Sequence, residues 1–393
     1  MSPPLHGITV VSLEQAVAAP FATRQLADLG ARVIKIERPD GGDFARSYDQ
    51  TVRGLSSYFV WLNRSKESLT LDLKHPDAQR VLVRLLERAD VFVQNLAPGA
   101  GDRLGVAADD LRVRYPRLIT CAVSGYGTSG PFAQKKAYDM LVQAEAGVVS
   151  ITGTPDVPSR VGISVADIAA GMYAYSGILT ALLARTSTGH GTTIDVSLFD
   201  ALGEWMGAPA YYTAYGEVEP PRSGAAHATI APYELFAAAD GVEIYLAIQN
   251  AREWKRFCEQ VLDQPALVTD PRFASNATRV QHRDVLHSVI ADVFAHLTGT
   301  DLIQRLESAG IAYARRNSVR EFLAHPQLVS RERWSEIGSP AGTLRALKPP
   351  VQMAGVEAVM GDIPSLGQHS EHILEELGFD SNTITTWRRE KLI

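Results

Sequence analysis

Hydrophobic and polar positions in the first part of the chain alternate between short apolar runs and one helical segment. Residues 8–13 and 31–37 are rich in β-branched side chains and predict strands. Residues 20–29 predict a helix that has a proline early and Gly30 as its stop. A strand–helix–strand unit implies two parallel strands with a right-handed crossover. The alternation continues with strands at 68–73, 91–94 and 118–124 and a helix at 76–88. This pattern predicts an open α/β sheet.

The residue composition and the pattern of predicted elements change after residue 200. We expect a large α/β domain over residues 1–200 and a smaller α+β domain over residues 228–326, with a strand at 242–248 and helices at 253–262 and 283–310. Segments rich in Gly, Pro and small residues predict linkers at 201–227 and 327–350. Residues 351–393 are then expected to return to the large domain and to form a helix at 370–377.

Composition restricts the classes of function. The chain has 393 residues, with 38 Lys and Arg against 44 Asp and Glu, which gives a net charge of −6. No basic excess is present to neutralise phosphates, so we expect neither a nucleic-acid partner nor a membrane partner. Cys121 and Cys258 lie too far apart in sequence for a disulfide framework, which fits a reducing, cytoplasmic setting. No basic and apolar leader precedes the first strand.

One uncharged stretch, residues 168–184, needs comparison with a membrane span. It has 17 residues between Asp167 and Arg185 and includes Gly, Ser, Thr and two Tyr. A spanning helix needs about 20 mainly apolar residues. We therefore interpret this stretch as a buried helix of a soluble protein.

The first strand–helix–strand unit resembles half of a Rossmann-like dinucleotide-binding domain, with Glu37 ending the second strand. Its turn at residues 14–20 contains no glycine, which disfavours NAD, because the backbone must approach a pyrophosphate there. Arg38 suits a phosphate monoester such as the 3′-phosphate of coenzyme A, although spacing alone favours a solvated surface charge. The sequence around Ser124 lacks the first glycine of the Gly-x-Ser-x-Gly motif, so serine hydrolase chemistry is not expected. His369 and His372 lack a third ligand nearby, so no metal site is expected.

Two aspartates precede helical patterns. Asp139 and Asp167 are first explained as helix N-caps, which need no function. Asp167 also stands at the start of the uncharged helix, where burial raises a carboxyl pKa and the helix terminus lowers it. A poorly hydrated but ionised carboxylate could attack a thioester. Both readings stay open on spacing alone.

Ordered motifs over nearly the whole chain resemble family III CoA-transferases, the superfamily of formyl-CoA and carnitine CoA-transferases and α-methylacyl-CoA racemases. The matching runs are residues 18–20, 29–39, 41–43, 63–68, 94–99, 124–127, 189–191, 195–198, 232–233 and 366–371. Each run is weakly specific, and their order along the chain is the stronger signal.

The resemblance implies the roles of specific residues. It places the aspartate nucleophile at Asp167 and the acyl-facing residues at Tyr138 and Asp139. The implied contacts to the CoA substrate are Arg38, Leu71, Lys74, Asn95, Leu96, Arg103 and Lys136. It further implies CoA thioesters as substrates, no permanently bound cofactor and no metal. The implied assembly is an interlocked homodimer, whose long linkers could be the segments 201–227 and 327–350; surface loops of a compact monomer are the alternative.

The implied reaction moves CoA from an acyl-CoA donor to a carboxylic acid through an aspartyl covalent intermediate. The N-terminal sequence is most similar to that of family members that use succinyl-CoA and C4–C5 dicarboxylates such as itaconate, mesaconate or citramalate. Val17 and the lack of a long glycine-rich loop argue against oxalate specificity. Racemases carry a histidine where this chain has Tyr138, a poor base at neutral pH, which favours transfer over α-proton exchange. A racemase and a non-catalytic acyl-CoA-binding protein remain as alternatives.

Overall fold

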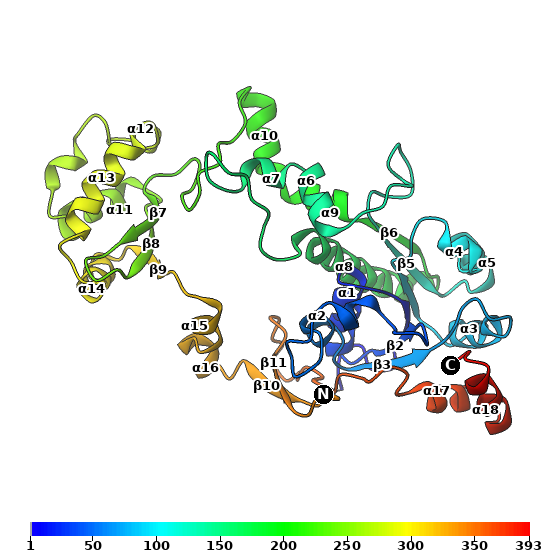
Figure 1. The fold of residues 1–393 in the computed structure, drawn as a ribbon. Coiled ribbons are helices and arrows are strands. Elements are labelled where there is room, and N and C mark those ends of the chain that lie inside the picture. Colours follow the sequence, from blue (N-terminus) through cyan, green and yellow to red (C-terminus); the bar gives the residue numbers. More distant parts are fainter. Residues whose placement is uncertain (1) are drawn as a thin grey trace. The chain divides into compact units, whose positions relative to one another are not determined.

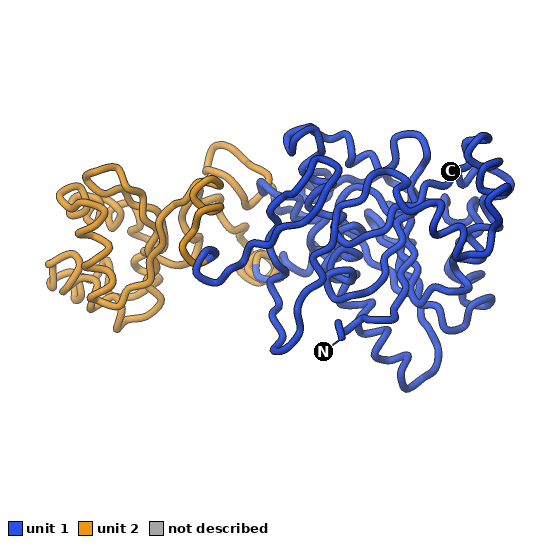
Figure 2. Tube along the Cα trace, turned by 90° about the horizontal axis from the view of Figure 1, so that it is seen from below, with its two compact units in different colours: residues 1–148, 161–208, 328–393 blue, residues 149–160, 209–327 orange. Residues whose placement is uncertain are grey.

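The computed structural model describes residues 2–393, which form two compact units. Unit 1 comprises residues 1–148, 161–208 and 328–393, and unit 2 comprises residues 149–160 and 209–327 (Figure 2). The chain therefore leaves unit 1 and later returns to it. Unit 2 ends at residue 327.

Unit 1 is built on a six-stranded parallel sheet with the order β3-β2-β1-β4-β5-β6 (Figure 1). The strands are β1 (Thr9–Leu13), β2 (Arg32–Glu37), β3 (Lys66–Thr70), β4 (Val91–Gln94), β5 (Ile119–Ser124) and β6 (Thr193–Ser197). Strand β1 pairs with both β2 and β4, so the strand order reverses between β1 and β4. In open α/β sheets ligands bind beyond the carboxyl ends of the strands at such a reversal. The expected open α/β architecture is confirmed.

Two layers of helices cover the sheet, and each buries its own apolar cluster. On one face, α1 (Ala18–Asp28) and α8 (Val165–Thr188) pack with every second residue of the strands, including Val10 and Val33. On the other face, Val11 and Ile34 pack with α3 and with two helices from the end of the chain. Strand residues thus alternate between the two faces, as the period of a β-strand requires.

The remaining helices of unit 1 are short. They are α2 (Ser57–Leu62), α3 (Ala78–Leu86), α4 (Ala100–Arg103), α5 (Ala108–Arg114), α6 (Asp139–Glu145), α9 (Leu198–Trp205), α17 (Ser370–Glu376) and α18 (Ser381–Arg389). An antiparallel pair, β10 (Trp334–Ile337) and β11 (Leu344–Leu347), also belongs to unit 1. Helix α18 was not expected from the sequence.

Unit 2 contains a three-stranded antiparallel sheet of β7 (Tyr233–Ala237), β8 (Glu243–Ala247) and β9 (Ala312–Arg315). Its own core surrounds Phe236, Phe257 and Phe294. Its helices are α11 (Ala251–Arg256), α12 (Asn276–Gln281), α13 (Arg283–Phe294), α14 (Gly299–Ala309) and α15 (Val319–Leu323). The expected α+β character is therefore present. Helices α7 (Val148–Ile151), α10 (Gly207–Gly216) and α16 (Pro326–Ser330) cross from one unit to the other along the chain.

Three sequence expectations differ from the structure. The stretch 201–227 contains most of α9 and all of α10, so it is helical up to residue 216. The expected helix at 283–310 is two helices, because Thr298 caps α14 by accepting a hydrogen bond from the backbone N–H of Asp301. The expected helix at 253–262 passes from α11 into a π-helical turn, Phe257–Val261.

Helix α8 is long and apolar enough to cross a membrane by length and composition alone, with a mean hydropathy of 1.3. It packs instead against α1, α9, β5 and β6 within unit 1, as a core helix does. It is less buried than the sequence predicts, because Met172, Tyr173 and Leu183 are exposed.

Candidate active site

A cavity of about 1010 Å³ opens beyond the carboxyl ends of β1, β2 and β3, beside the point where the strand order reverses. Its apolar lining comprises Leu13, Ile36, Leu71, Leu73, Leu96, Leu104 and Ile393. Three cations, Arg38, Lys74 and Lys391, also line it, and none of them forms an ion pair with a described residue. An apolar bed with free cations fits an adenine nucleotide that carries several phosphates.

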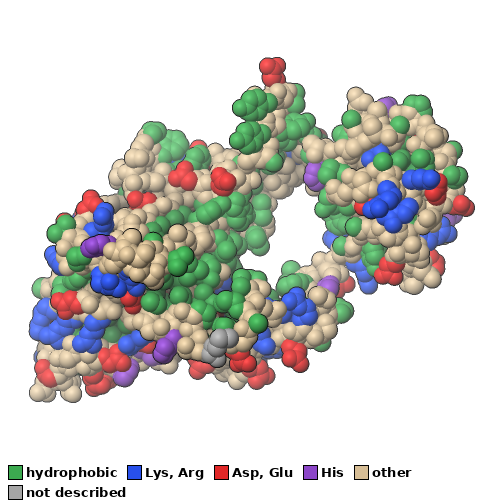
Figure 3. Space-filling model, turned by 180° about the vertical axis from the view of Figure 1, so that it is seen from behind, with side chains coloured by type: hydrophobic (Ala, Val, Ile, Leu, Met, Phe, Trp, Pro, Cys, Tyr) green, Lys and Arg blue, Asp and Glu red, His purple; other side chains and the backbone are tan. Residues whose placement is uncertain are grey.

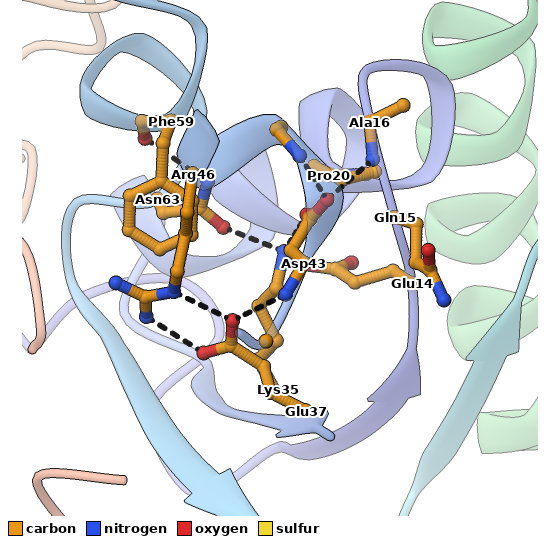
Figure 4. Close-up of polar contacts among 12 residues, drawn as sticks. Glu14, Gln15, Ala16, Pro20, Lys35, Glu37, Asp43, Arg46, Phe59 and Asn63 are labelled. Atoms are coloured by element: carbon orange, nitrogen blue, oxygen red, sulfur yellow. Dashed lines mark hydrogen bonds and ion pairs between the residues drawn. The ribbon is translucent and has the colours of Figure 1, made fainter. Parts of the chain in front are cut away.

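Three carboxylates of the cavity wall are already neutralised by a buried network (Figure 4). Lys35 Nζ lies 2.6 Å from Asp43 Oδ2, and Lys66 Nζ lies 2.6 Å from Glu14 Oε1. Glu37 pairs with Arg46 at 2.7 Å. Since these pairs cancel, the charge that a ligand meets comes from the three cations Arg38, Lys74 and Lys391 and from the two remaining lining carboxylates, Asp40 and Asp72.

The pKa values of the network follow from its pairing. Burial alone would raise the pKa of Glu14, but Lys66 and Lys35 lower it below its ordinary value. Burial also opposes the ionisation of Glu37, yet hydrogen bonds from Arg46 lower its pKa to about 2. Glu37 therefore stays ionised and occupied, and it is not free to bind the ribose of a dinucleotide, in line with the missing glycine turn.

The network fixes a strained turn at the head of α1. Ala16 has a φ of 63°, which is uncommon for a residue with a side chain. Its backbone N–H donates to Asp43 Oδ1 at 3.0 Å. Asn95 clamps the preceding residue, because its Oδ1 accepts from Gln15 N at 2.9 Å and its Nδ2 donates to Gln15 O at 2.8 Å. The turn is therefore held from two sides, and the side chain of Gln15 lines the cavity.

The two candidate aspartates meet at the start of α8. Asp139 Oδ1 accepts from the backbone N–H groups of Ala166 at 2.8 Å and Asp167 at 3.3 Å. Gln143 donates to Asp139 Oδ2 at 2.7 Å. Asp139 thus caps α8 from α6, while the residue before α8, Ser164, makes no side-chain cap. Interpreting each aspartate as the cap of its own helix was wrong: Asp139 is the first residue of α6, and Asp167 lies in the first turn of α8.

Asp167 is half-buried, and no described residue places a cation beside it. Burial and the neighbouring carboxylate of Asp139 raise the pKa of Asp167 to about 7. Near neutral pH the group is therefore partly ionised and poorly hydrated, which suits an oxygen nucleophile.

Two glycines allow the close approaches that build this end of the site. A Cβ on Gly125, just after β5, would lie 2.1 Å from the Cβ of Ala137, so glycine lets the segment before α6 pass close by. A Cβ on Gly171 would lie 2.7 Å from the carbonyl oxygen of Ala18, so glycine lets α8 pack against α1. These contacts place the start of α8 beside the start of α1.

Tyr48 links the cavity to Asp167. Burial, Asp43 and Asp167 together raise the pKa of Tyr48 to about 12, and Tyr138 contributes in the same direction. Asp43 lines the cavity, so the Tyr48 side chain is affected by a carboxylate of the cavity as well as by Asp167. Tyr48 also contacts Phe44 and Tyr58, with ring centroids 5.8 and 5.6 Å away. We therefore treat the cavity and the aspartate pair as parts of one candidate site in unit 1.

The residues expected at the site fall into two groups. The structure brings Tyr138, Asp139 and Asp167 together and places Arg38, Leu71, Lys74 and Leu96 in the cavity wall. Asn95 acts on the backbone of Gln15 instead of lining the cavity. Arg103 and Lys136 are exposed and lie outside the lining.

Sequence reasoning missed several residues of the site, of which four matter for the argument below. They are Gln15, Tyr48, Lys391 and Ile393. Gln15 stands in the turn that was examined for glycines, so its place after β1 was an available signal. The other three come from segments that only the tertiary fold brings to the cavity. Among the described residues, no group of three His, Cys, Asp or Glu side chains could hold a metal ion.

Comparison with known proteins agrees with this arrangement. The model of a family described as CoA-transferase family III matches residues 5–370. A succinyl-CoA:glutarate CoA-transferase of Mus musculus is 34% identical, with 97% of this chain and 88% of that protein covered. An acetyl-CoA:oxalate CoA-transferase of Acetobacter aceti is 37% identical, with 84% of each covered. The crystal structure of a CAIB/BAIF family protein from Brucella suis has a TM-score of 0.84 and 31% identity, with 96% of this chain and all of that chain covered.

Proposed function

The chain is an enzyme that belongs to CoA-transferase family III, and from this premise we propose that it moves CoA from succinyl-CoA to a C4–C5 dicarboxylate, with Asp167 as the covalent nucleophile. The observation that carries the proposal is the state of Asp167. It is half-buried, faces a second carboxylate and no cation, and has a pKa raised to about 7. Such a carboxylate gains more from forming an acyl bond than a solvated one, because the bond removes a poorly solvated charge.

The proposed reaction is a series of acyl transfers. The Asp167 carboxylate attacks the thioester carbonyl of the donor, which gives a mixed anhydride and releases the CoA thiolate. The thiolate attacks the aspartyl carbonyl of that anhydride, which gives an aspartyl-CoA thioester and releases the donor acid. The acceptor carboxylate attacks this thioester and forms a second anhydride, again with release of the thiolate. The thiolate then attacks the acceptor carbonyl, which yields the new acyl-CoA and restores Asp167. Each step exchanges one acyl bond for another, so no oxidant or metal enters the balance.

The cavity supports the CoA part of the proposal. Arg38 and Lys74 supply cations for its phosphates, and Leu71 and Leu96 supply apolar surface for adenine. Asp139 is proposed to hold the start of α8 and so to position Asp167. Tyr138 is proposed to face the acyl group. We keep Asn95, Arg103 and Lys136 as CoA contacts in the loaded enzyme, although Asn95 makes its present contacts to Gln15.

The choice of donor and acceptor rests on the relatives. The Mus musculus protein is named for succinyl-CoA and glutarate, a C5 dicarboxylate, and it aligns with 97% of this chain. We therefore propose glutarate, itaconate, mesaconate and citramalate as the first acceptors to test. The Acetobacter aceti protein is named for acetyl-CoA and oxalate, so that pair is the competing one.

The experiment that tests the function is detection of new CoA esters by mass spectrometry. Purified protein is mixed with succinyl-CoA and a pool of the four acceptors, oxalate and carnitine, and the same pool is run with acetyl-CoA. The expected result is a new dicarboxylyl-CoA with release of succinate, absent for Asp167→Asn. Intact-protein mass should show an aspartyl-CoA adduct in the wild type only. Binding of CoA without exchange from any donor would leave an acyl-CoA-binding protein, and deuterium uptake at the α-carbon of a branched acyl-CoA would establish the racemase.

A homodimer is proposed as the working assembly. Figure 3 shows hydrophobic side chains gathered on one face of unit 1, and α8 and α9 expose Met172, Tyr173, Leu183, Phe199 and Trp205. A second copy of the chain would cover such a surface, and the segments 201–227 and 327–350 would serve as the connections of an interlocked pair. A dimer that persists on dilution until the chain unfolds supports interlocking, whereas a reversible monomer–dimer equilibrium contradicts it. A cytoplasmic setting is proposed because both cysteines are free and buried.

A further inference from the structure

The segment that follows α18 contributes to the cavity wall. Lys391 and Ile393 line the cavity together with residues that follow β1, β2 and β3. These residues lie more than 300 positions from Arg38 in the sequence, and no motif of the chain points to them. Their presence beside Lys74 adds a third free cation to the CoA site.

The backbone of this segment is fixed. Leu392 is 0% exposed and packs in the apolar cluster beneath the cavity. Its carbonyl accepts a hydrogen bond from Asp72 N at 2.8 Å, and its N–H donates to Trp387 O at 2.9 Å. Trp387 in turn donates from Nε1 to Asp77 Oδ2 at 3.1 Å. The segment is therefore tied to the turn that carries Lys74.

Lys391 itself adopts an unusual backbone conformation. Its φ is 62°, in the left-handed region that residues with side chains rarely occupy. Such a conformation persists where the surroundings determine it, here the buried Leu392 on one side and α18 on the other. The residue is exposed and lines the cavity, and its side chain forms no ion pair with any carboxylate of residues 2–393. A well-held backbone that presents an unpaired lysine is the arrangement expected of a binding residue.

The charges of the cavity wall favour a phosphomonoester at this place. Glu14, Glu37 and Asp43 are each paired with a cation, which leaves Asp40 and Asp72 as the lining carboxylates without an ion pair. Lys74 and Lys391 come from two segments joined by the Asp72–Leu392 hydrogen bond. The lining of the same cavity includes apolar residues, among them Leu73 and Ile393, that suit an adenine ring. In CoA the monoester on the ribose lies next to adenine and carries close to two negative charges at neutral pH, more than either phosphate of the diphosphate.

We infer that Lys391, paired with Lys74, binds the 3′-phosphate of CoA and that Ile393 completes the adenine side of the cavity. This inference rests on the proposed function for the identity of the nucleotide. Arg38 is then left to the diphosphate, which leads from adenine towards Gln15 and Asp167.

The test compares CoA with dephospho-CoA, which lacks only the 3′-phosphate, by isothermal titration calorimetry. Lys391→Gln is expected to weaken CoA binding about tenfold and to leave dephospho-CoA binding within about twofold of the wild type. Lys74→Gln should show the same selective loss. The matched control is Arg389→Gln, which removes a positive charge two residues away, outside the cavity lining, and should change neither affinity.

Three results would overturn the inference. The first is a Lys391→Gln variant that binds CoA as tightly as the wild type. The second is a variant whose affinities for CoA and dephospho-CoA fall equally. The third is a variant whose affinities match those of Arg389→Gln. A thermal midpoint equal to that of Arg389→Gln confirms that the variant is folded. Free CoA undergoes no transfer, so a protein that binds CoA selectively through Lys391 but exchanges no acyl group overturns the proposed function and keeps the inference. Conversely, transfer activity in the wild type together with unchanged CoA affinity in Lys391→Gln supports the proposed function and overturns the inference.

Discussion

Unit 1 holds two groups of poorly solvated acidic side chains, and they differ in whether a cation compensates their charge. At the cavity wall, Glu14 and Glu37 are each matched by a lysine or arginine, and their pKa values lie below the ordinary range. At the start of α8, Asp167 faces Asp139 without a cation, and its pKa is raised to about 7. A buried acid with a counter-ion fixes the shape of the site, whereas a buried acid without one becomes reactive.

The largest effect is expected from removing the unmatched acid. Asp167→Asn should lower the exchange rate by roughly 10⁴-fold or more, because the amide cannot form the anhydride. The single-turnover rate with succinyl-CoA measures this loss. Asp200→Asn, on the neighbouring helix α9, is the matched control and should retain most of the activity. Exchange within tenfold of the wild type would show that Asp167 is not the nucleophile.

The same substitution should stabilise the folded protein at alkaline pH. The folded state holds the Asp167 proton up to a pH of about 7, whereas the unfolded carboxyl loses it near 3.8. Wild-type stability therefore falls as the pH rises from about 4 to 7. At pH 8 Asp167→Asn should raise the free energy of unfolding by about 1–4 kcal/mol, and at pH 4 by little. Urea unfolding at both values measures the difference, and an equal gain at pH 4 would contradict its electrostatic origin.

Breaking a matched pair should have the opposite effect on stability. Glu14→Gln or Lys66→Met alone should each cost about 3–5 kcal/mol, because each change leaves the buried network with one charge that is no longer fully compensated. The double variant should cost less than the sum, which a double-mutant cycle in urea measures. Arg388→Gln removes an exposed pair with Glu371 and should cost less than about 1 kcal/mol. Additive losses in the double variant would mean that the pair is not coupled.

The pH dependence should separate the two groups further. Asp167 must be ionised to attack, so the rate of the first acyl transfer should rise with pH through about 7. Asp139→Asn removes the neighbouring charge but keeps an oxygen for the N–H groups of α8, so the midpoint should move to lower pH by up to about one unit. Glu37 acts at the other end of the scale: its pKa of about 2 contributes stability that is complete above about pH 4.5 and is lost as the pH falls through 2. A rate midpoint unmoved by Asp139→Asn would disprove the coupling.

The sequence predicts a structural feature well when the residues that determine it lie close together in the chain. Strand β4 was predicted over its observed span, Val91–Gln94, because a β-branched run is a local signal. The split between α13 and α14 was also readable, since Thr298 and Asp301 have the spacing of a capping residue and the third helical position. Helix α18 was missed because its residues are mostly polar and its apolar side is narrow.

The pairing of charges could not be predicted. Lys35 and Lys66 stand in strands where alternation suggests solvent, yet they are buried, because Asp43 from the loop after β2 pairs with Lys35 and Glu14, directly after β1, pairs with Lys66. Asp139 caps α8 from 28 positions away, and no spacing rule anticipates a cap between helices. The resemblance of the motifs placed Asp167, but the reason for its reactivity, a second carboxylate and no cation, needed the tertiary structure.

The smallest effect is expected at Tyr138, which lies at the reactive end but carries no buried charge. The side chain is 65% exposed, and a neutral phenol is a weak base. Tyr138→Phe should therefore change kcat/KM by less than about threefold, with Tyr215→Phe on α10 as an exposed control. A loss of 100-fold or more, or α-proton exchange with solvent that the variant abolishes, would assign proton transfer to Tyr138. In that case reactivity at the start of α8 would no longer be confined to the unmatched carboxylates, and the contrast with the paired acids of the cavity would break.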